Sequence, residues 1–212
     1  QQAFGVGLGN QVITMTSPAP AAAVVSGPVY TPSATGGPSG NPVIFTIDAS
    51  AASVCSISSG DVSFQAVGTC VVNANQAGSS TYAAASQVQQ SFAVGKGTPI
   101  VSWSNPADIT YGTPLSAIQL NATASVPGTF TYNPVLNSVL GTGAGQVLSV
   151  DFTPTDSANY FNVNGTTVTI NVLKADPTLS VTNSPVVYNG SPQAAIVVGS
   201  VPGTVSNILY NG

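Results

Sequence analysis

The chain has 212 residues and a formal net charge of −4, and only 4% of its residues are charged, against roughly 25% in an average globular protein. Two basic residues exclude a basic groove for nucleic acid, and the absence of histidine excludes Ser-His-Asp and Cys-His catalysis. Since 43% of the residues are hydrophobic, the chain should fold, with a surface of uncharged polar side chains that fits an exported protein better than a cytosolic enzyme.

The first residues repeat a segment found further along the chain. The sequence QQAFGVGLG at residues 1–9 matches QQSFAVGKG at residues 89–97. Such internal similarity is typical of modular arrays. Because residues 89–95 close one repeat, we expect residues 1–9 to be the last strand of a preceding repeat. The natural protein then extends upstream, and any secretion signal lies there or has been removed.

Residues 10–96 form a complete repeat in which apolar and polar side chains alternate. Val43, Phe45 and Ile47 fall on one face of an extended segment, and residues 62–66 show the same period of two. Turn residues separate these runs, and the density of glycine and proline would break helices. The pattern predicts several short strands.

Cys55 and Cys70 lie in this repeat, and in an exported chain we expect them to be paired, with free buried thiols as the alternative. If their strands lay in one sheet, with the strand at residues 62–66 between them, they would be ~9.6 Å apart. A disulfide tolerates Cα separations of only ~4.4 to 6.8 Å. A bond therefore requires the Cys70 strand to cross to the opposite sheet, as a sandwich allows.

Residues 97–174 form a second complete repeat. The apolar faces of its longest runs consist of Leu148, Val150, Phe152, Val168, Ile170 and Val172. Tyr160, in DSANY, precedes the last strand, and Tyr82, in GSSTY, occupies the comparable place in the first repeat. Both are typical of tyrosine corners, in which the hydroxyl bonds a nearby backbone group and the ring enters the core. The alternative is contact with a ligand.

Residues 175–212 match the beginning of the second repeat, since SVPGT at residues 125–129 recurs at residues 200–204. Half a repeat cannot bury a sufficient core by itself. We therefore expect it to be completed by another copy or by further chain. Residues 1–9 could be donated to another copy by β-strand addition.

Short junctions connect the repeats. One contains Lys96 and Pro99, and the other contains Lys174 and Pro177. A proline close after the last strand limits the swing of the next repeat. We expect these four residues to form the inter-domain junctions.

The fold class follows from short strands separated by turns in repeats of about eighty residues. It is all-β, with tandem immunoglobulin-like antiparallel β-sandwiches connected as Greek keys and arranged in a linear array. The predicted domains are a terminal strand, two complete sandwiches and a half sandwich, at residues 1–9, 10–96, 97–174 and 175–212.

Three stretches of the sequence resemble bacterial immunoglobulin-like repeat domains. SVCSISSGDVSFQAVGTCVVNANQAGSSTYAAA resembles the cysteine-containing repeats of large bacterial surface proteins. ITYGTPLSAIQLNATASVPGTFTYNP with FTPTDSANY resembles the MBG-type domain, and VVYNGSPQAA with SVPGTV resembles the start of another. The resemblance implies a secreted or surface-anchored protein with many repeats and no catalytic motif.

Few residues in the sequence are of types that catalyse reactions or bind metals. Paired-carboxylate catalysis would need two of six scattered aspartates, and zinc would need cysteines that a disulfide explains better. Asp151 and Asp156 are the closest acidic pair, without a calcium-loop pattern. We expect no enzymatic activity, no cofactor and no metal site, with a calcium site at Asp151 and Asp156 as the alternative.

The expected function is structural: an extracellular or cell-surface repeat segment that forms a stalk or a self-assembling fibre. Its expected partners are other copies of the chain or neighbouring repeats. No apolar run approaches the ~20 residues of a membrane helix, so we expect no membrane insertion. The alternative is an adhesin segment that binds a glycan or a host protein through its loops.

Overall fold

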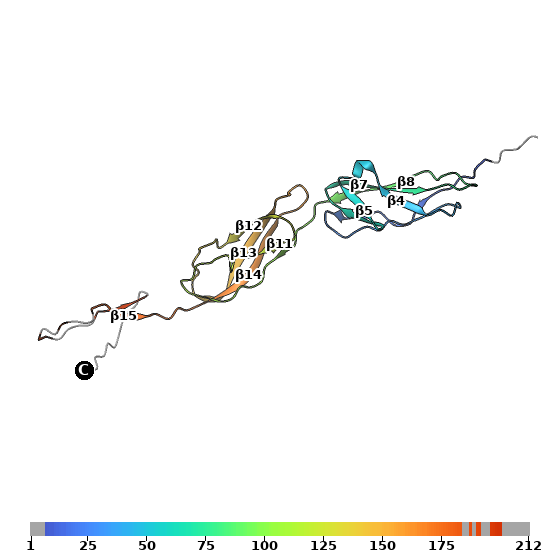
Figure 1. The fold of residues 1–212 in the computed structure, drawn as a ribbon. Helices are drawn as coiled ribbons and strands as arrows, with labels where there is room; N and C mark the ends of the chain where they lie inside the picture. Colours follow the sequence, from blue (N-terminus) through green and yellow to red (C-terminus); the bar gives the residue numbers. More distant parts are fainter. Residues whose placement is uncertain (1–6, 184–186, 188–189, 192–195, 201–212) are drawn as a thin grey trace, which may run out of the picture. The chain divides into compact units, whose positions relative to one another are not determined.

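The computed structural model describes residues 7–183, 187, 190–191 and 196–200, and in this part the chain is all-β (Figure 1). One short 3-10 turn, η1 (Ala49–Ala51), interrupts the strands, and the Asp48 side chain caps it by accepting a hydrogen bond from Ser50 N. The predicted all-β class is confirmed, since the strands form immunoglobulin-like β-sandwiches, whereas the arrangement in a linear array stays a prediction. Residues 1–6, the main part of the expected terminal strand, lie outside the described residues.

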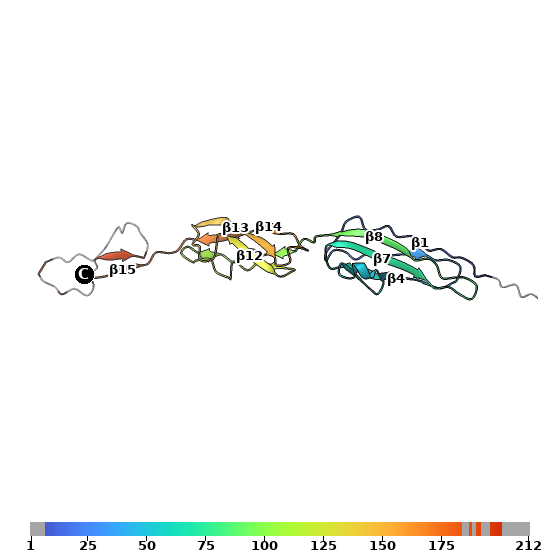
Figure 2. The same cartoon turned by 90° about the horizontal axis from the view of Figure 1, so that it is seen from above.

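Strands β1 to β8 make the first sandwich. Its largest sheet has the order β2-β8-β7-β4, and the sheets β1-β3 and β5-β6 complete it. In Figure 2, β7 lies beside β8, in agreement with their antiparallel pairing. The bounds are β1 (Thr14–Met15), β2 (Ala23–Val24), β3 (Ala34–Thr35), β4 (Val43–Ile47), β5 (Cys55–Ser58), β6 (Asp61–Phe64), β7 (Gly68–Gln76) and β8 (Val88–Gly95).

The core of the first sandwich lies between sheets that its disulfide connects. Cys55 on β5 and Cys70 on β7 are bonded, with their Cα atoms 5.8 Å apart. Because β5 and β7 belong to different sheets, the Cys70 strand has crossed the sandwich, as the distance argument requires. Both cysteines are fully buried, together with Val62 and Val72.

Strands β9 to β14 make the second sandwich, with a sheet of order β10-β14-β13-β12 and a second sheet of order β11-β9. Its longest strands bury the alternating residues named from the sequence, among them Leu148, Phe152 and Ile170. The bounds are β9 (Val101–Ser102), β10 (Ile109–Thr110), β11 (Thr123–Ala124), β12 (Gly128–Asn133), β13 (Gly143–Pro154) and β14 (Val163–Leu173).

Each sandwich contains one parallel pair among its antiparallel ones. In the first sandwich β2 runs parallel to β8, and in the second β10 runs parallel to β14. Both pairs join the beginning of a sandwich to its last strand. The expected antiparallel architecture is therefore modified at the same place in both sandwiches.

Contact density divides the chain into two compact units. One contains residues 1–104, 122–133 and 149–167, and the other contains residues 105–121, 134–148 and 168–212. This boundary passes through β13 and β14, so the domain limits taken from the repeats stay predictions. Beyond the second sandwich, β15 (Leu179–Val181) pairs with β16 (Val197–Gly199).

Candidate functional site

A connected set of polar contacts in the first compact unit surrounds Tyr160. Gly97 forms a parallel bridge with Tyr160: Gly97 N donates to Asn159 O at 2.9 Å, and Phe161 N donates to Gly97 O at 2.9 Å. A Cβ atom at Gly97 would lie 3.2 Å from two ring carbons of Tyr160 and would overlap the carbonyl oxygen of Val25. We call residues 156–160 together with Gly97 the Tyr160 corner.

The Asn159 side chain is held in one orientation. Its Nδ2 donates to Asp156 Oδ2 at 2.8 Å, and its backbone N donates to Asp156 Oδ1 at 3.2 Å. These bonds leave Asn159 Oδ1 to accept the backbone N–H of Val67 at 2.8 Å. The acceptor is thus preorganised for a backbone donor of the first sandwich.

Tyr160 itself packs against the buried core of the first sandwich. Its hydroxyl lies 2.8 Å from Ser26 Oγ, and Ser26 has a left-handed backbone with φ of 56°. This corrects the expected hydrogen-bond partner, which was a nearby backbone group. The backbone of Tyr160 forms a bridge with Gly97, whereas its hydroxyl bonds the side chain of Ser26, which is far away in sequence.

The four predicted junction residues behave differently. Lys96 Nζ donates to Ser157 O at 2.6 Å and lies 5.7 Å from the centroid of the Phe161 ring, within cation–π range. Pro99 is buried, whereas Lys174 and Pro177 are exposed. The structure therefore brings Lys96 to the Tyr160 corner, and it places Lys174 beside the pocket described below.

Tyr82 repeats the local geometry of Tyr160. Gly9 forms a parallel bridge with Tyr82: Gly9 N donates to Thr81 O at 2.8 Å, and Ala83 N donates to Gly9 O at 2.9 Å. A Cβ atom at Gly9 would lie 2.9 Å from the Tyr82 ring. Among the described residues the Tyr82 hydroxyl has no hydrogen-bond partner. We call residues 78–82 together with Gly9 the Tyr82 corner.

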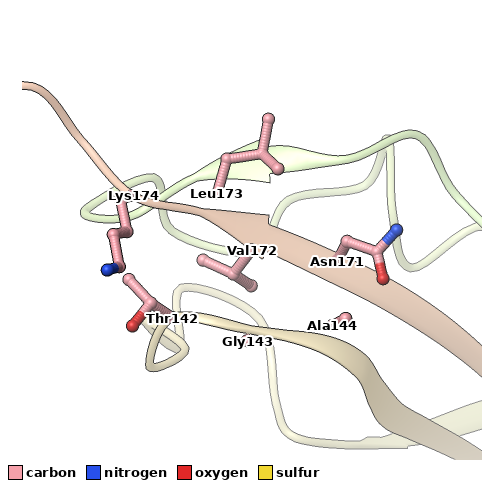
Figure 3. Close-up of a pocket in the computed structure, with 7 residues that line it drawn as sticks. All are labelled: Thr142, Gly143, Ala144, Asn171, Val172, Leu173 and Lys174. Carbon is pink, nitrogen blue, oxygen red and sulfur yellow. The ribbon is translucent and has the colours of Figure 1, made fainter.

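A pocket of about 480 Å³ lies at the end of the second sandwich where β14 leaves it (Figure 3). In the figure Val172 points between the two strands, Leu173 points to the other side of β14, and Lys174 and Thr142 stand at the mouth. The lining residues are Thr142, Gly143, Ala144, Asn171, Val172, Leu173 and Lys174.

The pKa values of Asp48 and Tyr132 are shifted by their surroundings. Hydrogen bonds from Ser50 and then Asn73 hold the pKa of Asp48 below its ordinary value. Burial raises the pKa of Tyr132, whose hydroxyl accepts a hydrogen bond from Ala122 N. No cluster of three metal-ligating side chains occurs among the described residues. Asp151 and Asp156 instead accept hydrogen bonds from Gly165 N and from Asn159.

Replacing Gly97 by alanine should open the Tyr160 corner, because the new Cβ atom would overlap the Val25 carbonyl oxygen. The hydrogen bond from Val67 N to Asn159 should then weaken, and we expect the Val67 amide to exchange about tenfold faster, as for a lost bond of about 1.4 kcal/mol. Hydrogen exchange followed by NMR measures the exchange rate of the Val67 amide. Gly141→Ala is the matched control, since a Cβ atom at Gly141 meets nothing within 4 Å. Unchanged exchange in Gly97→Ala would contradict the close approach.

No helix in the described residues is long and apolar enough to cross a membrane.

Comparison with known proteins gives a likeness of fold. No family model matches the chain, and no curated protein matches it. Among solved structures the chain is similar to Drosophila N-cadherin EC1-3, with 15% identity, 77% of this chain and 68% of that chain covered, and a TM-score of 0.29. The chain is also similar to Drosophila N-cadherin EC1-4, with 14% identity and a TM-score of 0.30. This match covers 78% of this chain and 51% of that chain, so the chain spans about half of that structure.

Proposed function

We propose that the chain is a non-enzymatic, load-bearing segment of an extracellular structural protein, a stalk made of bacterial immunoglobulin-like repeats. The observation that carries the proposal is the parallel pairing of the beginning of each sandwich with its last strand. Support for an exported location comes from the buried disulfide, which is typical of oxidising compartments, and from a surface with very little charge.

The parallel pairs respond to pulling in a particular way. In the first sandwich Ala23 pairs with Val94 and Val24 with Gly95, and Val25 N donates to Gly95 O at 3.0 Å. Tension enters at the amino-terminal side of β2 and leaves at the carboxyl-terminal side of β8. Two parallel strands pulled from these ends must slide along each other, so their hydrogen bonds are loaded together rather than one after another.

The second sandwich has the same arrangement. Ile109 pairs with Val172 and Thr110 with Leu173, and Tyr111 N donates to Leu173 O at 2.8 Å. In both sandwiches, therefore, the parallel pair near the points where the chain enters and leaves is the first structure that resists extension.

The proposal is tested by stretching single molecules of the variant Tyr111→Pro with optical tweezers. Proline has no backbone N–H, so the hydrogen bond to Leu173 O is lost. We expect the unfolding force of the second sandwich to fall clearly, while the force of the first sandwich stays unchanged. Tyr111→Ala is the control, since it removes a side chain that is 47% exposed and keeps the N–H group. If the second sandwich of Tyr111→Pro unfolds at the same force as that of Tyr111→Ala, the proposal is wrong.

The disulfide should also limit how far the first sandwich extends. The bond spans 15 positions in sequence, and the loop it closes cannot be pulled out while it is intact. At ~3.4 Å per residue, we expect the length released by this sandwich to increase by roughly 50 Å after reduction. Force–extension traces with and without reductant measure the difference. Equal lengths would mean that the bond does not form in solution.

A further inference from the structure

Residues 156–160 of the Tyr160 corner are anchored in the second sandwich. Thr155, the residue that follows β13, donates its backbone N–H to Pro127 O at 3.0 Å, and Pro127 directly precedes β12. Within the corner, Tyr160 N donates to Asp156 O at 3.1 Å, which closes a tight turn. The folded second sandwich therefore fixes the position of these residues.

The groups that receive the corner lie at three strand ends of the first sandwich. Ser26 lies two residues after β2, Val67 directly precedes β7, and Lys96 directly follows β8. Strands β2, β8 and β7 are neighbours in one sheet. One short segment of the second repeat thus holds three adjacent strands of the first sandwich. The contacts are Ser26 Oγ with the Tyr160 hydroxyl, Val67 N with Asn159 Oδ1 and Lys96 Nζ with Ser157 O.

Strand β2 has few other hydrogen bonds to keep it in place. It consists of residues 23–24 and pairs with β8 at two positions. Ser26 N donates to Phe64 O at 3.0 Å, so Ser26 also connects the end of β2 to β6 in the other sheet. The backbone of Ser26 has φ of 56°, a conformation that is unfavourable for a residue with a side chain. The bond from the Tyr160 hydroxyl helps to hold Ser26 in this conformation.

The ring of Tyr160 belongs to the core of the first sandwich. It packs, half-buried, against a hydrophobic cluster whose other members all lie between residues 23 and 94. Residues 149–167 also fall in the same compact unit as the whole first sandwich. A tyrosine of the second repeat therefore completes the packing of the first.

We infer that residues 156–160 act as a clamp that makes the stability of the first sandwich depend on the folding of the second. When the second sandwich unfolds, this segment loses its anchor at Pro127. The first sandwich then loses the Tyr160 ring from its core together with three polar contacts, and β2 frays. Because such coupling is reciprocal, the first sandwich stabilises the second by the same amount.

Local features of the chain prepare the clamp for this contact. The Asn159 amide is oriented by Asp156, so that its oxygen faces the backbone N–H of Val67. Gly97 lets the two sandwiches approach, because a Cβ atom there would overlap the carbonyl oxygen of Val25. The inference concerns equilibrium stability without load. It goes beyond the load-bearing function and does not rest on it, so either can fail alone.

Amide exchange of the full chain in urea tests the coupling. Phe152→Ala removes a buried ring from the second sandwich, whereas Leu136→Ala truncates an exposed side chain of the same sandwich. Fluorescence of Trp103, whose ring lies against Tyr132, shows the urea concentration at which only the Phe152→Ala variant has lost its second sandwich. At this concentration we expect the Ser26 amide to exchange about tenfold faster in Phe152→Ala than in Leu136→Ala. Equal rates would overturn the proposal.

Removal of one hydroxyl tests the clamp itself. Tyr160→Phe keeps the ring and removes the bond to Ser26 Oγ, so the Ser26 amide should exchange roughly fivefold faster without urea. Tyr82→Phe is the matched control, because the Tyr82 hydroxyl has no hydrogen-bond partner among the described residues, and it should leave the rate unchanged. An unchanged rate in Tyr160→Phe, or the same increase in both variants, would show that the contact does not hold β2.

Discussion

Replacing Cys55 and Cys70 together by alanine should lower the free energy of unfolding of the first sandwich by about 3 kcal/mol. The disulfide spans 15 positions, and closing a loop of this size restricts the unfolded chain by about that amount in the chain-entropy model. Each cysteine is also at most 1% exposed, so the change removes two sulfur atoms from the core. Urea denaturation followed by amide exchange, resolved by mass spectrometry, measures the loss in the first sandwich.

The single tryptophan separates this effect from one on the second sandwich. Trp103 lies next to Tyr132, with ring centroids 5.3 Å apart, so its fluorescence reports on strands β9 and β12. We expect the tryptophan transition to keep its midpoint in the double alanine variant. The control is the pair Ser56→Ala and Ser63→Ala on the exposed face of the β5-β6 hairpin, where changes of at most ~0.5 kcal/mol are expected. A disulfide variant as stable as this control would contradict the loop-closure argument.

Replacing Phe152 by alanine should destabilise the second sandwich by about 3 to 5 kcal/mol, the range for truncating a buried phenylalanine. Phe152 is 1% exposed, and its ring lies 4.9 Å from that of Phe130, centroid to centroid. The Phe152 ring on β13 also fills the space beside Gly128 on the neighbouring strand β12. A Cβ atom at Gly128 would overlap this ring. The shift of the Trp103 fluorescence transition in urea gives the measurement.

Leu136→Ala provides the comparison, because the Leu136 side chain is 55% exposed in the same sandwich. Its truncation should change stability by no more than ~0.5 kcal/mol. If Phe152→Ala and Leu136→Ala cost the same, then Phe152 does not lie in a packed core.

The cores could be predicted from the sequence because strand geometry is local. Alternation in β4 and β13 fixes which side chains point inward, and the sites of Phe45 and Val150 follow directly. The faces of Cys55 and Cys70 follow in the same way. The bond itself then required a second sheet, since no single sheet brings their strands close enough.

The parallel pairs and the partner of Tyr160 could not be predicted in this way. Strands β2 and β10 have two residues each, too few to show a period. The bond from Tyr160 to Ser26 joins residues 134 positions apart, and no local pattern specifies such a pair. The bridge to each corner tyrosine did have a signal in the sequence, since Gly9 and Gly97 are identical in the aligned repeats and bridge Tyr82 and Tyr160.

The pairing of β2 with β8 also sets an order of events during synthesis. Ala23 emerges early, but its partner Val94 is among the last residues of the first sandwich to be made. The chain must hold β2 unpaired over this interval, and contacts of such long sequence separation form slowly. The first sandwich therefore closes only after β8 has been made, and because β10 pairs in the same way with β14, the second sandwich closes only after its own last strand.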